Sequence, residues 1–335
     1  MEKFLDDLAT ELDISESRYE AAERSYKSVG DWLNRSNSTL KDADPQVYIQ
    51  GSFRLGTVTR PISDEEGYDV DLVCELKFRK DGITQANLKA LLGRELQEYA
   101  RVHSMERPEA GRRCWTLNYA DGAQFHLDSL PALPDGAVMG AVLRSHGLSS
   151  AWAETAIAIT DEEHPGYQLR TSNWPHSNPK GYTLWFRSRM QTVFEARRKA
   201  LALKARASVE AIPEYRVKTP LQTVVQILKR HRDLTFKDDP ENRPISIIIT
   251  TLAAQAYGQE LTIEAALYGI LSRMERFIEN RNGVAWIANP TDPLENFADK
   301  WEDHPERGAA FFAWLAQARK DFEAAARAAD RAGIV

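Results

Sequence analysis

Two aspartates separated by one residue are the first feature of the sequence with a clear chemical meaning. Asp69 and Asp71 lie in residues 68–76, whose alternation of polar and apolar residues predicts a β-strand. Successive strand side chains point to opposite faces, so both carboxylates share one face while Val70 and Leu72 point into the core. Carboxylates this close repel each other unless a cation lies between them, and their oxygens suit Mg²⁺ held jointly with nucleotide phosphates. The pattern leaves open a solvated sheet face.

A third carboxylate, Asp128, lies in a second strand-like run, residues 123–130. Alternation places it on one face with Gln124 and His126, opposite the apolar residues of the run. A carboxylate near the first two would complete a second metal site and accept a proton from an attacking hydroxyl. We interpret His126 as a neighbour or a packed residue, because an oxygen-rich set fits Mg²⁺ better than an imidazole does.

A glycine and a serine, Gly51 and Ser52, directly follow the short β-rich run 47–49. Glycine after a strand lets backbone N–H groups approach a polyphosphate closely. The segment lacks the lysine of a Walker P-loop, and Pro61 argues against a long helix after it, so a P-loop NTPase is not expected. An ordinary turn is the alternative for these two residues taken alone.

The elements that must position these residues change in type along the chain. Residues 1–35 have helical periodicity, and strands at 46–49 and 68–76 are followed by a helix at 84–102 and two more strands. The Pro-, Gly-, Ser- and Trp-containing stretch 131–181 is expected to be an irregular connection. From residue 182 onward the pattern is helical. We therefore predict an α+β fold, with an α+β domain at 1–180 and an all-α lobe at 181–335.

Composition narrows the class of protein. The 335 residues include 43 lysines and arginines against 49 aspartates and glutamates, a net charge of −6, so the whole chain lacks the positive field of non-specific nucleic-acid binders. With 43% hydrophobic residues, disordered and fibrous proteins are excluded. No apolar stretch is long enough to cross a bilayer, no secretory signal is visible, and two cysteines are too few for a disulfide framework. We expect a cytoplasmic protein with no membrane partner.

These residues follow a fixed order along the chain: a Gly-Ser turn, two carboxylates 18 and 20 residues after the glycine, and a later third carboxylate. This order resembles the motif of the DNA polymerase β superfamily of nucleotidyltransferases. Three further segments narrow the resemblance. They are the run Gln-Ile-Leu-Lys229-Arg-His-Arg-Asp, the run Pro-Ile-Ser246 at the start of a helix, and residues 289–301, which are similar to a segment of the oligoadenylate synthetases. The chain thus resembles the CD-NTases, the bacterial relatives of animal cyclic GMP-AMP synthase that make cyclic oligonucleotides in anti-phage defence.

The resemblance implies a polymerase-β-like mixed sheet joined to the all-α lobe, with nucleotide bound in a cleft between them. It implies that Asp69, Asp71 and Asp128 are catalytic and bind two Mg²⁺ ions, for which Mn²⁺ substitutes, and that Gly51 and Ser52 hold the donor triphosphate. Lys229 and Ser246 match positions that contact the nucleotide from the helical side. Helical periodicity agrees with this role for Lys229, since it places the lysine on one helix face with Gln222 and Gln226, beside the apolar stripe.

The implied activity is joining NTPs, ATP with GTP or UTP, into a cyclic di- or trinucleotide with release of pyrophosphate. A regulatory protein and a downstream effector are implied as partners by the family alone, and direct DNA activation is not implied because no zinc ribbon is visible. Two other interpretations stay open. One is a template-independent nucleotidyltransferase acting on an RNA end, a small molecule or a protein hydroxyl, using basic residues between 187 and 206. The other is a non-catalytic nucleotide sensor on the same fold.

Overall fold

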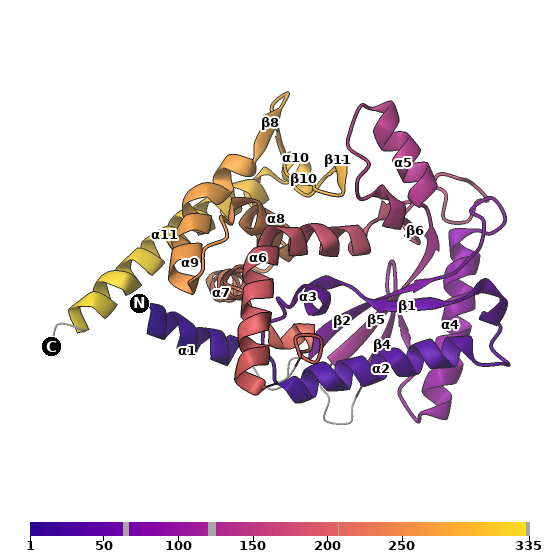
Figure 1. Cartoon of the computed structure of the whole chain (residues 1–335). Helices are drawn as coiled ribbons and strands as arrows, with labels where there is room; N and C mark the ends of the chain where they lie inside the picture. Colours follow the sequence, from indigo (N-terminus) through magenta and orange to yellow (C-terminus); the bar gives the residue numbers. More distant parts are fainter. Residues whose placement is uncertain (63–66, 120–124, 207, 333–335) are drawn as a thin grey trace. The chain divides into compact units, whose positions relative to one another are not determined.

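The computed structural model describes residues 1–62, 67–119, 125–206 and 208–332. Contacts within the chain divide it into two compact units (Figure 1). The sheet unit comprises Ile14–Leu55 and Pro61–Leu184. The helical unit comprises Met1–Asp13, Gly56–Arg60 and Trp185–Val335. The predicted domain limits, 1–180 and 181–335, stay a prediction.

A mixed sheet forms the centre of the sheet unit. Its described strands run in the order β1-β2-β5-β4-β3, and β6 joins the end of β5 and pairs in turn with β7. The central pair, β2 and β5, is parallel, whereas the other pairs are antiparallel. The strands are β1 (Gln46–Ile49), β2 (Tyr68–Glu75), β3 (Glu109–Ala110), β4 (Trp115–Tyr119), β5 (Phe125–Pro134), β6 (Ile157–Ile159) and β7 (His176–Ser177). The predicted α+β class is confirmed.

One face of this sheet is apolar and covered by helices. Val70, Leu72 and Leu127 are fully buried, as the alternation predicted. Helix α4 (Gln85–Val102) begins at a Thr84 cap and contacts β4 and β5, and α2 (Glu16–Asn34) contacts β1 and α4. Gly93 of α4 lies against the indole of Trp115, so close that a Cβ there would lie 2.3 Å from a ring carbon. The covered face leaves the opposite face to the carboxylates.

The stretch 131–181 differs from the predicted irregular connection. Strand β5 continues to Pro134, and Ala132–Pro134 pair with the three residues of β6. Between them lie α5 (Gly136–Ser145) and the short 3₁₀ turn Ala153–Thr155. The short strands were missed because two- and three-residue strands carry no periodicity of their own, and their pairing partner is distant in sequence.

Helices dominate the helical unit, as the helical pattern from residue 182 onward predicted. They are α1 (Glu2–Leu12), α6 (Pro179–Ala205), α7 (Pro220–Thr235), α8 (Ser246–Ala256), α9 (Ile263–Arg273), α10 (Lys300–Asp303) and α11 (Pro305–Ala332), with α6 starting inside the sheet unit. Two small hairpins, β8–β9 (Glu279–Arg281, Val284–Trp286) and β10–β11 (Ala288–Asn289, Asp292–Asn296), were not foreseen. The remaining short 3₁₀ turns are Lys41–Ala43, Glu214–Arg216 and Met274–Phe277.

Helix α7 organises the helical unit. A capping box between Thr219 and Gln222, followed by Pro220 at the first helical position, fixes where it begins. Its apolar stripe, which includes Leu221 and Leu228, is fully buried as predicted. Among the described residues, no helix of the molecule is long and apolar enough to cross a membrane.

Candidate active site

The register of β2 and β5 brings the three predicted carboxylates onto one face of the sheet. Asp71 pairs directly with Asp128 across the parallel strands, and Asp69 pairs with His126. Along both strands the apolar neighbours are buried, whereas His126 and Asp69 are exposed and the two paired aspartates are half-buried. The predicted alternation is therefore confirmed for residues 68–72 and 125–129, whereas residues 73–74 and 130–133, which follow in the two strands, are buried on both faces. Gln124, also expected on this face, lies outside the described residues.

Hydrogen bonds hold the β5 side of this face in place. Strand β4 contributes the Thr116 hydroxyl, which donates to one oxygen of Asp128. Asn118, next along the same face of β4, lies 2.8 Å from the imidazole Nδ1 of His126. His126 is thus engaged with an amide beside the carboxylates, in agreement with its interpretation as a neighbour.

The charges on this face interact unfavourably. Loss of hydration, followed by the negative charge of Asp128, raises the pKa of Asp69 above its ordinary value, and His126 only partly opposes this. The thiol of Cys114 responds to the same field, because burial and then Asp128 raise its pKa to about 11. A protonated thiol is a poor metal ligand. The face is therefore an oxygen-donor site whose negative charges favour a cation.

The oxygen donors of these aspartates are suited to a divalent metal ion. Carboxylate oxygens are the ligands that Mg²⁺ prefers, and Mg²⁺ usually completes its shell with water and substrate phosphates. Within the described residues, no group of three or more His, Cys, Asp or Glu side chains converges closely enough to hold a metal by itself. Asp69, Asp71 and Asp128 therefore fit a metal that is bound together with phosphate oxygens rather than a closed protein cage.

Gly51 lies directly against this face. It begins the short helix α3 (Gly51–Leu55) with φ +63°, and a Cβ built on it would lie 2.1 Å from Oδ2 of Asp71. The neighbouring backbone is fixed because Gln50 N–H donates to the carbonyl of Asp71 at 2.8 Å. Both the backbone conformation and the close approach require glycine. Ser52 follows it, half-buried, in the first turn of α3.

The structure describes Lys229 and Ser246 within the helical unit. Lys229 is buried on α7, and its Nζ donates to the carbonyl of Thr57 at 2.9 Å. Ser246 is the first residue of α8, and its Oγ accepts a hydrogen bond from Arg232 at 2.9 Å. Contact of either residue with a nucleotide stays a prediction.

Gln226, on the same face of α7 as Lys229, and Lys218, which precedes the helix, both bind one short segment, Gly56–Arg60, which directly follows α3. Gln226 donates to the carbonyl of Val58 at 2.5 Å, and Lys218 donates to the carbonyl of Gly56 at 3.0 Å. Lys218 is also paired with Asp13, and burial lowers the pKa of its ammonium. The polar face of α7 therefore serves first to fix the backbone that leaves the Gly-Ser helix.

The basic residues of α6 are largely occupied within the protein. Arg189 donates to the carbonyls of Ala254 and Gln255 at the end of α8, and Arg197 and Arg198 also donate to backbone carbonyls. Arg187 is paired with Glu214. Of these four arginines, only Arg187 is neutralised by an ion pair within the described residues, whereas the other three keep their charge and are held in place by the carbonyls.

Sequence reasoning missed a second polar cluster on the carboxylate-bearing face. Tyr48 donates to Oε2 of Glu75 at 3.0 Å, and Nζ of Lys180 contacts the same oxygen at 3.0 Å. The ammonium of Lys180 also lies 3.9 Å from the centre of the Tyr48 ring. No sequence signal links these residues, because Lys180 lies 105 positions after Glu75. We call these three residues the Glu75 cluster.

Comparison with known proteins places these features in a family context. The family model described as "Cyclic GMP-AMP synthase DncV-like, nucleotidyltransferase domain" matches residues 45–131, which include Gly51, Ser52 and all three aspartates. A c-di-GMP synthase of Roseivirga ehrenbergii is 30% identical over 317 residues, covering 94% of this chain and 77% of the relative.

Solved structures show the same fold. The CdnG of Bradyrhizobium diazoefficiens in complex with GTP is similar with a TM-score of 0.71 at 21% identity, covering 96% of this chain and 90% of that one. The CdnC of E. coli MS115-1 in complex with HORMA-deltaN is similar with a TM-score of 0.62 at 13% identity, covering 95% of this chain and 88% of that one.

Proposed function

The chain belongs to the CD-NTase family of cyclic dinucleotide synthases, and we propose that it joins two nucleoside triphosphates on the carboxylate face of β2 and β5. A ribose hydroxyl attacks the α-phosphorus of the donor, the bond to pyrophosphate breaks, and a second such step closes the ring. The observation that carries this proposal is the pairing of Asp71 with Asp128 across the parallel strands, beside Gly51.

Nucleotidyltransferases of this family use divalent metal ions, and the proposed ligands here are Asp69, Asp71 and Asp128. The chemistry that bound Mg²⁺ supplies is neutralisation of the charge on the attacking and leaving oxygens. The raised pKa of Asp69 supports this assignment, because loss of hydration and then the charge of Asp128 make its ionised form costly in the absence of a cation.

The protein's own groups orient the reactants and move the proton. Thr116 occupies one oxygen of Asp128, which leaves the other to accept the proton of the attacking hydroxyl. Gly51 and Ser52 hold the donor triphosphate through the backbone at the start of α3, where the absence of a side chain at 51 allows close approach. Lys229 and Ser246 are the other two residues that we propose to bind nucleotide.

Relatives of known structure suggest substrates and a partner. One contains GTP and another is bound to a HORMA protein. We extend these observations to this chain as proposals: GTP is a substrate and a regulatory protein controls it. ATP is proposed as a second substrate from the resemblance of the sequence. The alternative of an RNA substrate is less favoured, because hydrogen bonds hold the guanidinium groups of Arg189, Arg197 and Arg198 against backbone carbonyls and an ion pair neutralises Arg187.

The test is incubation of the purified protein with all four NTPs and Mg²⁺, followed by phosphatase treatment and mass spectrometry. A phosphatase-resistant cyclic dinucleotide is expected from the wild type and no product from the Asp69→Asn/Asp71→Asn double variant. Asp42→Asn, at an exposed aspartate, is the matched control and retains full activity. Cyclic product from the double variant, or phosphatase-sensitive linear chains from the wild type, would overturn the proposal.

A further inference from the structure

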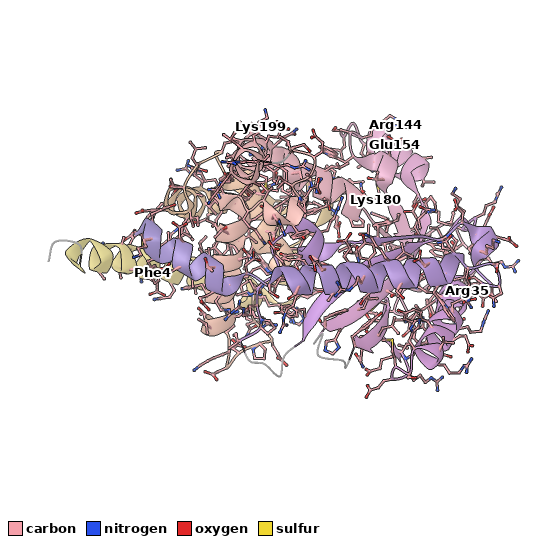
Figure 2. The ribbon with its side chains drawn as sticks, turned by 60° about the horizontal axis from the view of Figure 1, so that its bottom comes forward. Phe4, Arg35, Arg144, Glu154, Lys180 and Lys199 are labelled. Atoms are coloured by element: carbon pink, nitrogen blue, oxygen red, sulfur yellow. The ribbon has the colours of Figure 1, made fainter. Side chains whose placement is uncertain are left out.

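Within the described residues, the Glu75 cluster contains an acceptor atom and donor groups that form no hydrogen bond with the protein. Both contacts of the Glu75 carboxylate fall on Oε2, and among the described residues Oε1 receives no hydrogen bond. The ammonium of Lys180 makes one hydrogen bond and one contact with the Tyr48 ring, so two N–H groups remain for a ligand. The Lys180 side chain is 41% exposed and that of Glu75 is 16% exposed, so a solute reaches this pair. Lys180, labelled in Figure 2, lies in the first turn of α6.

Tyr48 fixes the geometry of this pair rather than contacting a ligand. Its ring packs on the apolar cluster of Val73, Leu130 and Ile157, and Lys180 lies over the ring. Burial and the nearby Glu75 charge raise the pKa of its phenol, which keeps the hydroxyl protonated as a donor to Glu75. The carboxylate and the ammonium are therefore held side by side with their free polar atoms available.

The position of the cluster suits the base of a nucleotide bound at the aspartates. Glu75 lies four residues after Asp71 on the same strand, so strand alternation places both side chains on one face. A rise of about 3.3 Å per residue separates their Cα atoms by about 13 Å. This separation matches the reach from the phosphates of a nucleotide to the far edge of its base.

We propose that Glu75 and Lys180 recognise the Watson–Crick edge of guanine, with Tyr48 as a positioning residue. Guanine presents a carbonyl, O6, beside two donors, N1–H and the N2 amino group. The lysine donates to O6, as lysine does in protein contacts with guanine in DNA, and the Oε1 atom of Glu75 accepts from N1–H and N2 with its two lone pairs. Adenine has an amino group, N6, in place of O6 and an unprotonated N1 in place of N1–H. The contacts of Lys180 with N6 and of Glu75 with N1 are therefore both repulsive. Uracil offers the carboxylate one donor instead of two. This inference rests on the proposed function.

Binding of the α,β-methylene analogues of GTP and ATP, with Mg²⁺, tests the assignment without turnover. The wild type is expected to prefer the guanine analogue. Glu75→Gln and Lys180→Met are expected to lower its affinity for that analogue by roughly 10- to 100-fold while changing affinity for the adenine analogue less than about threefold. The matched control is Lys77→Met, which breaks the exposed Lys77–Asp44 ion pair near the end of the same strand and changes neither affinity.

A charge-swapped variant separates recognition from a purely structural ion pair. Glu75→Lys combined with Lys180→Glu restores attraction between the two positions, and Tyr48→Phe tests the hydroxyl that orients Glu75. Recognition predicts that the swap stays defective for the guanine analogue although its melting temperature recovers. Recovery of guanine affinity in the swap, equal losses for both analogues, or a wild type without base preference would each overturn the proposal. Failure of the proposed function is seen separately, as wild-type protein that binds the guanine analogue but releases no cyclic product from NTPs.

Discussion

Replacing Gly51 with alanine tests the link between the Gly-Ser helix and the carboxylate face. The new Cβ would lie 2.1 Å from Oδ2 of Asp71, whereas real Cβ contacts are essentially never shorter than 3.0 Å. The carboxylate therefore has to retreat by about 1 Å. A misplacement of about 1 Å in a catalytic constellation costs on the order of 100-fold in rate. The positive φ adds about 1–2 kcal/mol of backbone strain to the folded state.

The assay for Gly51→Ala is the initial rate of pyrophosphate release at saturating NTP and Mg²⁺, with thermal unfolding measured on the same sample. Gly147→Ala is the matched control, because Gly147 has φ +69° and nothing lies within 4 Å of the position that its new methyl group would take. Both variants carry the same strain, so both lose similar stability, and only Gly51→Ala loses activity. A Gly51→Ala enzyme within about threefold of the wild-type rate would refute the argument that this glycine protects the position of Asp71.

Three further changes have defined outcomes. Asp69→Asn raises the melting temperature of the metal-free protein at pH 7, because the raised pKa of Asp69 means that its ionisation destabilises the fold. Above about pH 4 the unfolded state binds fewer protons at this position than the folded state, so the stability of the wild type falls as the pH rises. Below about pH 4 the carboxyl group is protonated in both states, and the variant is no longer more stable than the wild type. Gln226→Leu lowers the free energy of unfolding in urea by about 1–3 kcal/mol, because the buried carbonyl of Val58 loses its donor. Gly93→Ala lowers the melting temperature, corresponding to about 1–3 kcal/mol of overpacking against Trp115, although alanine favours helix.

Matched variants isolate each of these effects. Gln191→Leu removes an exposed glutamine amide and leaves stability unchanged. Gly30→Ala places its Cβ no closer than 3.6 Å to any neighbour, so it gains up to about 1 kcal/mol from helix propensity. Equal effects of the two glutamine variants, or of the two glycine variants, would contradict the packing arguments. An Asp69→Asn protein that is less stable than the wild type at pH 7 in EDTA would contradict the electrostatic one.

Local periodicity was enough to predict much of the carboxylate face. The alternation around Asp69 and Asp71 dictates that they share a face, because a strand turns every second side chain to the same side. The same rule separates Asp128 from its buried neighbours on β5. Helical periodicity likewise predicted the buried stripe of α7 and the side on which Lys229 lies. These features depend on residues close together in the chain.

Only the tertiary structure decided which distant residues meet. Strand register, which sequence spacing does not encode, pairs Asp71 with Asp128 and brings Gly51 against the same carboxylate. Side-chain contacts across more than 100 residues commit Lys229 to the backbone of Thr57 and place Lys180 beside Glu75. The sequence by itself determined the donor atoms of the site and the face that carries them. Their pairing came from packing, because register and long-range contacts are set by the whole core rather than by any local pattern.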